Sequence, residues 1–369
     1  MPAFSPHKTS AWPLALTYAA LVIYASLYPF AEWRDQGIAP WAFVTAPLPK
    51  YWTGFDVAIN VAGYAPLGFL LALSALRTRR VRHALSSATL VAGMLSLLLE
   101  TVQSYLPVRV PSNVDLALNI CGGWLGAAAA AALERLGALD RWSRVRERWF
   151  VPDARDALVL LALWPFALLY PPAVPLGLGQ VFERVETGLA ELLQDSPFLD
   201  FMPVRSIELQ PLVPAAEMVC VMLGALIPCL LAYGIVRSMR RRALCLLAIA
   251  AIGVGASGLS AALSYGPAHA WAWFELPVQA GLGAAFVLAT LLLAAPRRAC
   301  AALVLLMLGI YLSLLNQAPA SAYFAQTLQT WEQGRFIRFH GVGQWLGWLW
   351  PYAALAYVLA EVWSPESNA

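Results

Sequence analysis

The chain has 369 residues, of which 60% are hydrophobic and 12% are charged, and its formal net charge is +3. Soluble domains carry about 25% charged residues, so this composition excludes an ordinary soluble protein. Apolar runs of about 20 residues, the length that crosses a bilayer as a helix, recur along the whole chain. The basic residues stand in short runs between them, so we expect no nucleic acid partner. The sequence predicts an all-α, polytopic integral membrane protein.

The hydropathy pattern predicts about ten transmembrane helices. The first begins at Trp12-Pro13, after a polar N-terminus, and no signal-peptide cleavage site follows it, so we expect it to be retained. The predicted spans cover approximately residues 12–30, 55–76, 84–106, 114–134, 155–176, 211–236, 243–264, 272–295, 299–316 and 342–362.

The connections between the spans predict the orientation. Most of the lysines and arginines follow the second, fourth, sixth and eighth spans, with the longest run between Arg135 and Arg155. Basic residues concentrate on the cytoplasmic side of membrane proteins. We therefore predict that both the N-terminus and the C-terminus are cytoplasmic. The hairpin between the third and fourth spans then faces outward.

This hairpin contains charged residues inside otherwise apolar helices. Glu100 follows three leucines, and Asp115 is followed by Leu-Ala-Leu. A charge at the centre of a membrane helix costs about 2.5–3.5 kcal/mol on insertion scales. Arg109 is the nearest basic residue in sequence, so we predict that it pairs with Glu100. In the third span, Thr89, Gly93, Ser96, Glu100 and Gln103 recur at helical spacing, which predicts a stripe that faces protein or water rather than lipid.

A short motif occurs twice, 59 residues apart. Asp56-Val-Ala-Ile-Asn-Val-Ala-Gly63 aligns without gaps on Asp115-Leu-Ala-Leu-Asn-Ile-Cys-Gly122. Both copies run in the same direction, so we predict a parallel two-helix repeat, as is found in some transporters. The alternative is that two helices independently need an acidic N-terminal cap and a small residue for close packing. Gly122 and Gly126 also form a GxxxG pair for helix contact.

These motifs resemble those of the VanZ-like family. The resemblance covers roughly residues 15–135 and rests on Asp56, Asn60, Ala65-Pro66-Leu67-Gly68-Phe69-Leu70, Glu100, Gln103, Arg109, Asp115, Asn119 and Gly122-Gly123. The family is named after an accessory protein that lowers susceptibility to the glycopeptide teicoplanin. The resemblance implies a multi-pass protein of the bacterial cytoplasmic membrane that acts on the cell envelope. It implies no established molecular activity.

The polar residues of the motifs are the candidate site: Asp56, Asn60, Glu100, Gln103, Arg109, Asp115 and Asn119. In one interpretation they bind, mask or move a membrane lipid or a lipid-linked envelope precursor, with Arg109 holding an anionic group. In a second, the carboxylates act as acid and base in a membrane-embedded enzyme. In a third, they form a structural ion network. We predict no cofactor and no metal site, and expect the five cysteines to be small buried residues.

The predicted domain organisation has three parts. Residues 1–135 form a four-helix domain that is VanZ-like, residues 136–155 a basic cytoplasmic linker, and residues 156–369 a region of about six spans. Two extracytoplasmic segments of this region, near 180–195 and 322–338, have amphipathic patterns that predict helices at the membrane interface.

Overall fold

The computed structural model describes residues 11–28, 30, 32–49, 54–78, 83–170, 172–194, 196–197, 209–319 and 337–363. In these residues the regular structure is helical apart from one isolated antiparallel bridge between Phe150 and Val236. The chain divides into two compact units, Met1–Arg146 (unit 1) and Glu147–Ala369 (unit 2). The all-helical prediction is confirmed, and the division falls inside the predicted linker, residues 136–155.

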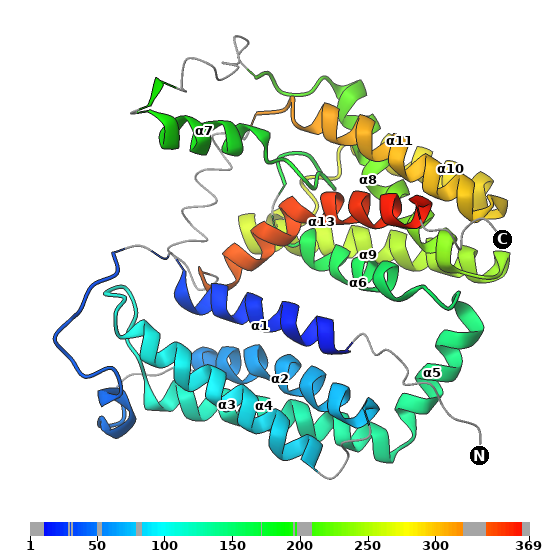
Figure 1. Cartoon of the computed structure of the whole chain (residues 1–369). Helices are drawn as coiled ribbons and strands as arrows, with labels where there is room; N and C mark the ends of the chain where they lie inside the picture. Colours follow the sequence, from blue (N-terminus) through cyan, green and yellow to red (C-terminus); the bar gives the residue numbers. More distant parts are fainter. Residues whose placement is uncertain are drawn as a thin grey trace. The chain divides into compact units, whose positions relative to one another are not determined.

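Unit 1 contains the apolar helices α1 to α4, a long connection between α1 and α2 with a 3-10 turn, and the charged helix α5 (Figure 1). They are α1 Ala11–Leu27, the 3-10 turn η1 Ala42–Thr45, α2 Gly54–Arg77, α3 Ala84–Gln103, α4 Asn113–Arg135 and α5 Ala138–Trp149, whose last turn belongs to unit 2. Pro107 and Pro111 separate α3 from α4, because proline cannot donate a helical hydrogen bond. Ser112 then caps α4, its hydroxyl accepting from the backbone N–H groups of Val114 and Asp115.

Small residues allow the helices of unit 1 to pack closely. Ala72, Ala84, Ala88, Ala127 and Ala130 belong to one buried cluster contributed by α2, α3 and α4. Helices in a membrane associate by close packing of small side chains, because lipid is as apolar as the helix surface. The alanines on the facing sides of α2, α3 and α4 therefore explain why these three helices pack against one another.

Unit 2 is built around one helix that is buried on nearly all sides. Its elements are α6 Arg155–Ala167, α7 Phe182–Leu193, α8 Pro214–Ile235, α9 Met239–Tyr265, the 3-10 turn η4 Pro267–His269, α10 Leu276–Leu291, the 3-10 turn η5 Leu292–Ala294, α11 Arg297–Leu315 and α13 Ile337–Trp363. A helix that is apolar all round belongs in an interior, and α8 is such a helix. Its Val221, Leu226, Leu230 and Tyr233 are fully or almost fully buried.

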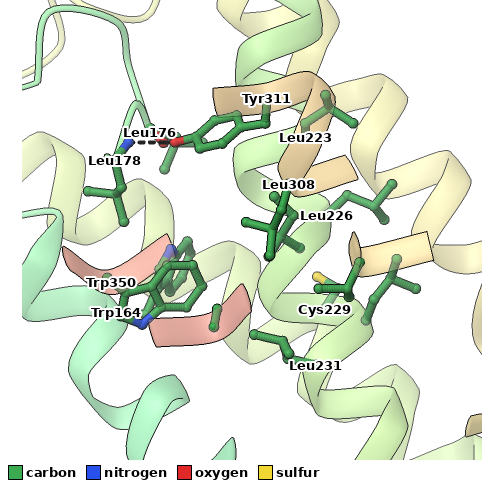
Figure 2. Close-up of a cluster of buried hydrophobic side chains, with 14 of the residues drawn as sticks. Trp164, Leu176, Leu178, Leu223, Leu226, Cys229, Leu231, Leu308, Tyr311 and Trp350 are labelled. Atoms are coloured by element: carbon green, nitrogen blue, oxygen red, sulfur yellow. Dashed lines mark hydrogen bonds between the residues drawn. The ribbon is translucent and has the colours of Figure 1, made fainter. Parts of the chain in front are cut away.

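Figure 2 shows the core around α8. Leu223 and Leu226 of α8 belong to one buried cluster with Leu308 of α11, and Trp164 of α6 lies beside Trp350 of α13. The indole N–H of Trp350 donates to the carbonyl of Leu160, 2.7 Å away. This bond satisfies the only polar atom of a buried tryptophan.

The predicted span 155–176 is a shorter helix than expected. Helix α6 ends at Ala167 and is followed by a non-helical connection in which Leu168, Val174, Leu176 and Leu178 are buried. The prolines at 172 and 175 explain the early end, because each lacks a backbone N–H. Non-helical backbone at membrane depth is tolerated only where protein groups satisfy it.

Two polar side chains of α11 and its C-terminal end satisfy this connection. The Tyr311 hydroxyl donates to the Leu176 carbonyl at 2.7 Å and accepts from the Leu178 N–H (Figure 2). Asn316 Oδ1 accepts from the N–H groups of Val181 and Phe182, at 3.0 and 3.1 Å, and so caps the N-terminus of α7. The buried connection is thus fixed by residues about 135 positions away in sequence.

All ten predicted spans coincide with a helix, but the helices differ in length. Within the described residues, seven are long and apolar enough to cross a membrane: α2 from Asp56, α3, α4, α8, α9, α10 with η5, and α11. Helix α1 is apolar but has 17 residues, α6 has 13 and α13 has 27. The chain is a multi-pass membrane protein, while the count of ten and the cytoplasmic termini stay predictions.

Other predictions have mixed outcomes. Helix α7 lies where an amphipathic segment was predicted near 180–195, and Phe182, Val185 and Leu192 on its apolar face are exposed. Most of the second segment, 322–338, lies outside the described residues. Cys220, Cys229 and Cys300 are buried as predicted, whereas Cys245 is only partly buried and Cys121 on α4 is exposed.

Candidate functional site

The candidate site lies where α2 and α4 begin and α3 ends. Helices α2 and α4 are parallel, because Val61 meets Gly122 and, four residues further along both helices, Ala65 meets Gly126. These pairs are 61 residues apart in sequence, close to the 59 that separate Asp56 from Asp115. The two acidic first turns therefore lie at the same end of the helix pair.

Glycines of α4 make this contact possible. A Cβ atom added to Gly122 would meet the backbone of Val61, and one added to Gly126 would meet the backbone of Ala65. The predicted GxxxG contact is confirmed. Since backbone atoms cannot rotate away, only glycine allows this approach of α4 to α2.

A hydrogen bond joins the two helices at the level of the acidic residues. Asn60 of α2 is 8% exposed, and its Nδ2 donates to Asp115 Oδ1 of α4 at 2.7 Å. A hydrogen bond to a charged acceptor is about twice as strong as one between neutral groups. This contact holds two of the predicted site residues together.

Asn119 links α4 to α3 one turn further along. It is 5% exposed, and its Nδ2 donates to Ser96 Oγ at 3.0 Å. The Tyr64 hydroxyl of α2 also lies within hydrogen-bonding reach of Ser96 and near Glu100. Asn119 Oδ1 is buried and has no hydrogen-bond partner among the described residues. A buried carboxamide oxygen without a donor costs about 1–3 kcal/mol.

Glu100 is the most buried carboxylate of the candidate site. It is 5% exposed, and its Oε2 accepts from the backbone N–H of Ser112 at 2.9 Å. Ser112 is also the N-cap of α4, so the carboxylate lies beside the positive end of the α4 dipole. The carboxylate thus links the end of α3 to the start of α4. The predicted pairing of Glu100 with Arg109 stays a prediction.

Gln103 and Arg109 contact the C-terminal end of α1. Gln103 Nε2 donates to the Ser26 carbonyl at 2.9 Å. Arg109 Nη2 donates to the carbonyls of Ala25 and Tyr28, at 3.2 and 2.9 Å. The last carbonyls of a helix have no partner within it, and a cation is favourable there. Arg109 therefore caps α1, a role that its sequence neighbours do not indicate.

The segment 32–49 is attached to the same end of unit 1. Gln36 Nε2 donates to the Ser104 carbonyl at 2.7 Å, and Asn113 Nδ2 donates to the Ala46 carbonyl at 2.7 Å. The N–H of Arg34 donates to the carbonyl of Tyr105 at 3.0 Å. These bonds fix the segment against the α3–α4 connection.

The two copies of the repeated motif make different contacts. Asn60 binds Asp115, whereas the matching Asn119 binds Ser96. Gly122 lies against the backbone of α2, whereas a Cβ on the matching Gly63 would meet nothing within 4 Å. Structural equivalence of the second and fourth spans stays a prediction. The contacts of the matching residues differ between the two spans.

Sequence reasoning missed three residues of the polar network. Tyr64 lies one helical turn after Asn60, and this spacing alone could have placed it on the same face. Ser112 stands in Pro-Ser-Asn before an apolar run, which is a helix N-cap signal. Ser96 was recognised as part of the polar stripe of α3 but not as a partner of Asn119.

The comparison with known families covers the same part of the chain. Residues 4–134 match the VanZ/LLP1 family model. No curated protein and no solved structure matches the chain. The resemblance based on the motifs is thus shown for this segment, and we call unit 1 the VanZ/LLP1-like unit.

The VanZ/LLP1-like unit has an apolar groove beside the polar network. Its volume is about 780 Å³, and α3 and α4 line it through Leu85, Ser86, Thr89, Leu90, Gly93, Met94, Leu97, Leu116, Ile120 and Trp124. Leu97 lies three residues before Glu100, and Leu116 directly follows Asp115. One end of the groove is therefore within about a helical turn of two site carboxylates.

The chemistry available in the VanZ/LLP1-like unit is hydrogen bonding and charge. Among the described residues, no group of three or more His, Cys, Asp or Glu side chains is arranged to hold a metal ion. The network offers carboxylates, carboxamides and hydroxyls within about a helical turn of residues that line the apolar groove. These groups suit the polar headgroup of an amphipathic ligand.

Proposed function

We propose that the VanZ/LLP1-like unit binds a lipid-linked sugar or glycolipid of the cell envelope. The hydrocarbon chain occupies the groove between α3 and α4, and the sugar lies at the polar network. Such binding masks or moves the lipid, and it would alter susceptibility to glycopeptides such as teicoplanin in the way that the family name suggests. The observation that carries this proposal is that the groove is lined by Leu97 and Leu116, which stand three residues and one residue from Glu100 and Asp115 in the sequence.

Three further features support a ligand rich in hydrogen-bond donors. Asn119 Oδ1 is a buried acceptor that a hydroxyl group of a sugar would satisfy. Asp56, Glu100 and Asp115 add carboxylates, which accept hydrogen bonds from hydroxyl and amino groups. Arg109 already binds the end of α1, which makes it a poor clamp for an anionic headgroup.

The position of the segment 32–49 favours entry of the lipid ligand into the groove sideways, from the surrounding bilayer. It is bonded to the α3–α4 connection, at the end of the helices where the site residues lie. A ligand that enters along the groove from the surrounding lipid does not have to displace this segment. The ligand's chain then remains in an apolar environment throughout binding.

The first experiment tests the headgroup contact. Purified full-length protein is mixed with a polyisoprenyl diphosphate-linked disaccharide, a diacylglycerol glycolipid and phosphatidylcholine, and retained lipids are counted by native mass spectrometry. We expect a sugar-bearing lipid to be preferred over phosphatidylcholine. Asn119→Leu should weaken that preference by about two- to tenfold, the worth of one hydrogen bond. Ser264→Ala is the matched control, because Ser264 Oγ is also buried, has no hydrogen-bond partner in the described part of the chain, and belongs to unit 2.

The second experiment tests the groove. Thr89→Trp places a large ring in the groove, whereas Val91→Trp, on α3 outside the groove lining, is the matched control. We expect only Thr89→Trp to reduce retention of the sugar-bearing lipid. If both tryptophan variants and Asn119→Leu retain lipids as the parent does, the network is structural and the proposal is wrong.

A further inference from the structure

Helix α5 begins almost directly where a membrane-spanning helix ends. Helix α4 ends at Arg135, and Gly137 adopts the left-handed conformation, with φ at +66°, before α5 starts at Ala138. The N–H groups of Leu136 and Gly137 donate to the carbonyls of Ala132 and Glu134, a hydrogen-bonded helix end of the kind that glycine favours. With two residues between a span and the next helix, α5 must start at the membrane surface.

An ion pair links the start of α5 to a second span. Arg77 Nη1, in the last turn of α2, lies 3.5 Å from Asp140 Oδ1. Both α2 and α4 are long and apolar enough to span a membrane. The first turn of α5 is thus held at the ends of two such helices.

The side chains of α5 are separated into three stripes. Trp142, Val145 and Trp149 recur at spacings of three and four residues, which places them on one face. Trp142 is 55% exposed and Val145 is 40% exposed, so the protein leaves much of this face uncovered. An exposed apolar face on a helix at the membrane surface is suited to burial in lipid.

The charges of α5 are arranged around this face. Arg141, Arg144 and Arg148 each directly precede one of the apolar residues, so they form a stripe about 100° around the helix from it. Asp140 and Glu147 are seven residues apart and lie on the opposite side. These three arginines therefore lie along one side of the apolar face, while the two acids lie on the opposite side of the helix.

Further arginines lie at the C-terminal end of α5. The Arg241 guanidinium packs over the Trp149 ring at 5.4 Å from its centroid and donates to the carbonyl of Arg148. Arg237 Nε donates to the Phe150 carbonyl at 2.8 Å. The connection between α8 and α9 thus adds positive charge beside the last turn of α5.

We propose that α5 lies in the membrane interface and binds the headgroups of anionic phospholipids. Trp142 and Val145 insert between the lipids, and Arg141, Arg144 and Arg148 contact the phosphate groups. Arginine stems cover apolar surface while their charged ends remain at the headgroups. The surface of α5 therefore makes the VanZ/LLP1-like unit sensitive to the charge of the membrane around it.

Insertion is tested with a pair of cysteine variants in the full-length protein. Val145→Cys is on the apolar face and Glu147→Cys on the opposite side, and both positions are exposed in the protein itself. A difference in their reaction with a water-soluble maleimide therefore reports the bilayer. In nanodiscs containing phosphatidylglycerol and phosphatidylcholine, we expect cysteine 145 to react much more slowly than cysteine 147. The parent chain measures the background from the native cysteines. Equal reaction rates at the two positions would overturn the insertion.

Headgroup binding is tested by native mass spectrometry of the full-length protein with equal amounts of phosphatidylglycerol and phosphatidylcholine. Each arginine at an anionic surface contributes about a fivefold preference. Arg144→Gln should therefore reduce the preference for phosphatidylglycerol by about that factor, and R141Q/R144Q/R148Q should reduce it further. Arg34→Gln, which removes one exposed arginine from the 32–49 segment, is the matched control. An unchanged preference in the triple variant, or an equal loss in Arg34→Gln, would contradict the assignment.

Discussion

The contact between α2 and α4 yields a sharp prediction, because the repeated motif supplies its own control. In Gly122→Ala, the new Cβ would lie 2.9 Å from the Cα and 3.0 Å from the carbonyl carbon of Val61. Both are backbone atoms, so the two helices must move apart. Overpacking of this kind costs about 1–3 kcal/mol. The smaller backbone entropy of alanine offsets about 0.5–1 kcal/mol of that cost.

The matching substitution, Gly63→Ala, has no such cost. A Cβ at Gly63 meets nothing within 4 Å, so alanine should be neutral or stabilise the helix by about 0.5–1 kcal/mol. We expect the two variants to differ by about 1–3 kcal/mol in free energy of unfolding, which is the overpacking cost alone, because both variants gain the same backbone entropy from alanine. The measurement is equilibrium unfolding in mixed dodecyl maltoside and sodium dodecyl sulfate, followed by circular dichroism. Equal stabilities would refute the close contact at Gly122.

Two further predictions concern the rest of the chain. Tyr311→Phe removes the hydroxyl that satisfies the buried connection after α6, and should reduce the free energy of unfolding by about 2–4 kcal/mol, because one donor and one acceptor lose their partner. Leu312→Val, which deletes one methylene nearby on α11, is the control and should cost about 1 kcal/mol. The predicted orientation places a cysteine at Glu147 in the cytoplasm and one at Thr187 outside, and maleimide labelling of intact cells against opened cells decides it. Labelling of both positions from the same side would contradict the topology.

The positions of the helices could be predicted from the sequence because bilayer length and apolar composition determine them locally. The polar stripe of α3 was also predictable, since Ser96, Glu100 and Gln103 follow helical spacing and such residues avoid lipid. Asn60 and Asp115 were selected for their chemistry, and the structure brings them into contact. These features could be predicted because they depend on neighbouring residues in the sequence or on the general preference of polar residues to avoid lipid.

The remaining features of the structure depend on contacts between residues that are far apart in the sequence. Arg109 binds the end of α1, more than 80 residues earlier, whereas the sequence offered only Glu100 as a nearby partner. The end of α6 follows from prolines, but the fixed shape of the connection comes from Tyr311. Gly63 and Gly122 occupy matching motif positions, and only packing distinguishes their environments.

The final prediction is the energetic coupling of Glu100 and Arg109, which a double-mutant cycle measures. Each residue has a separate task, because Glu100 accepts from the Ser112 N–H and Arg109 caps α1. Glu100→Gln and Arg109→Gln should therefore each reduce the free energy of unfolding. If the two residues also form a buried pair, the loss of one partner costs about 3–5 kcal/mol. Arg109→Gln should be the milder change, because Glu100 can bind a proton when its partner is lost.

If the two residues pair, the double variant loses at least about 1 kcal/mol less than the sum of the single variants. Additive losses would show that they act independently, with Arg109 serving α1 alone. A double variant that folds as stably as the parent but no longer retains the sugar-bearing lipid would place the pair in the binding site.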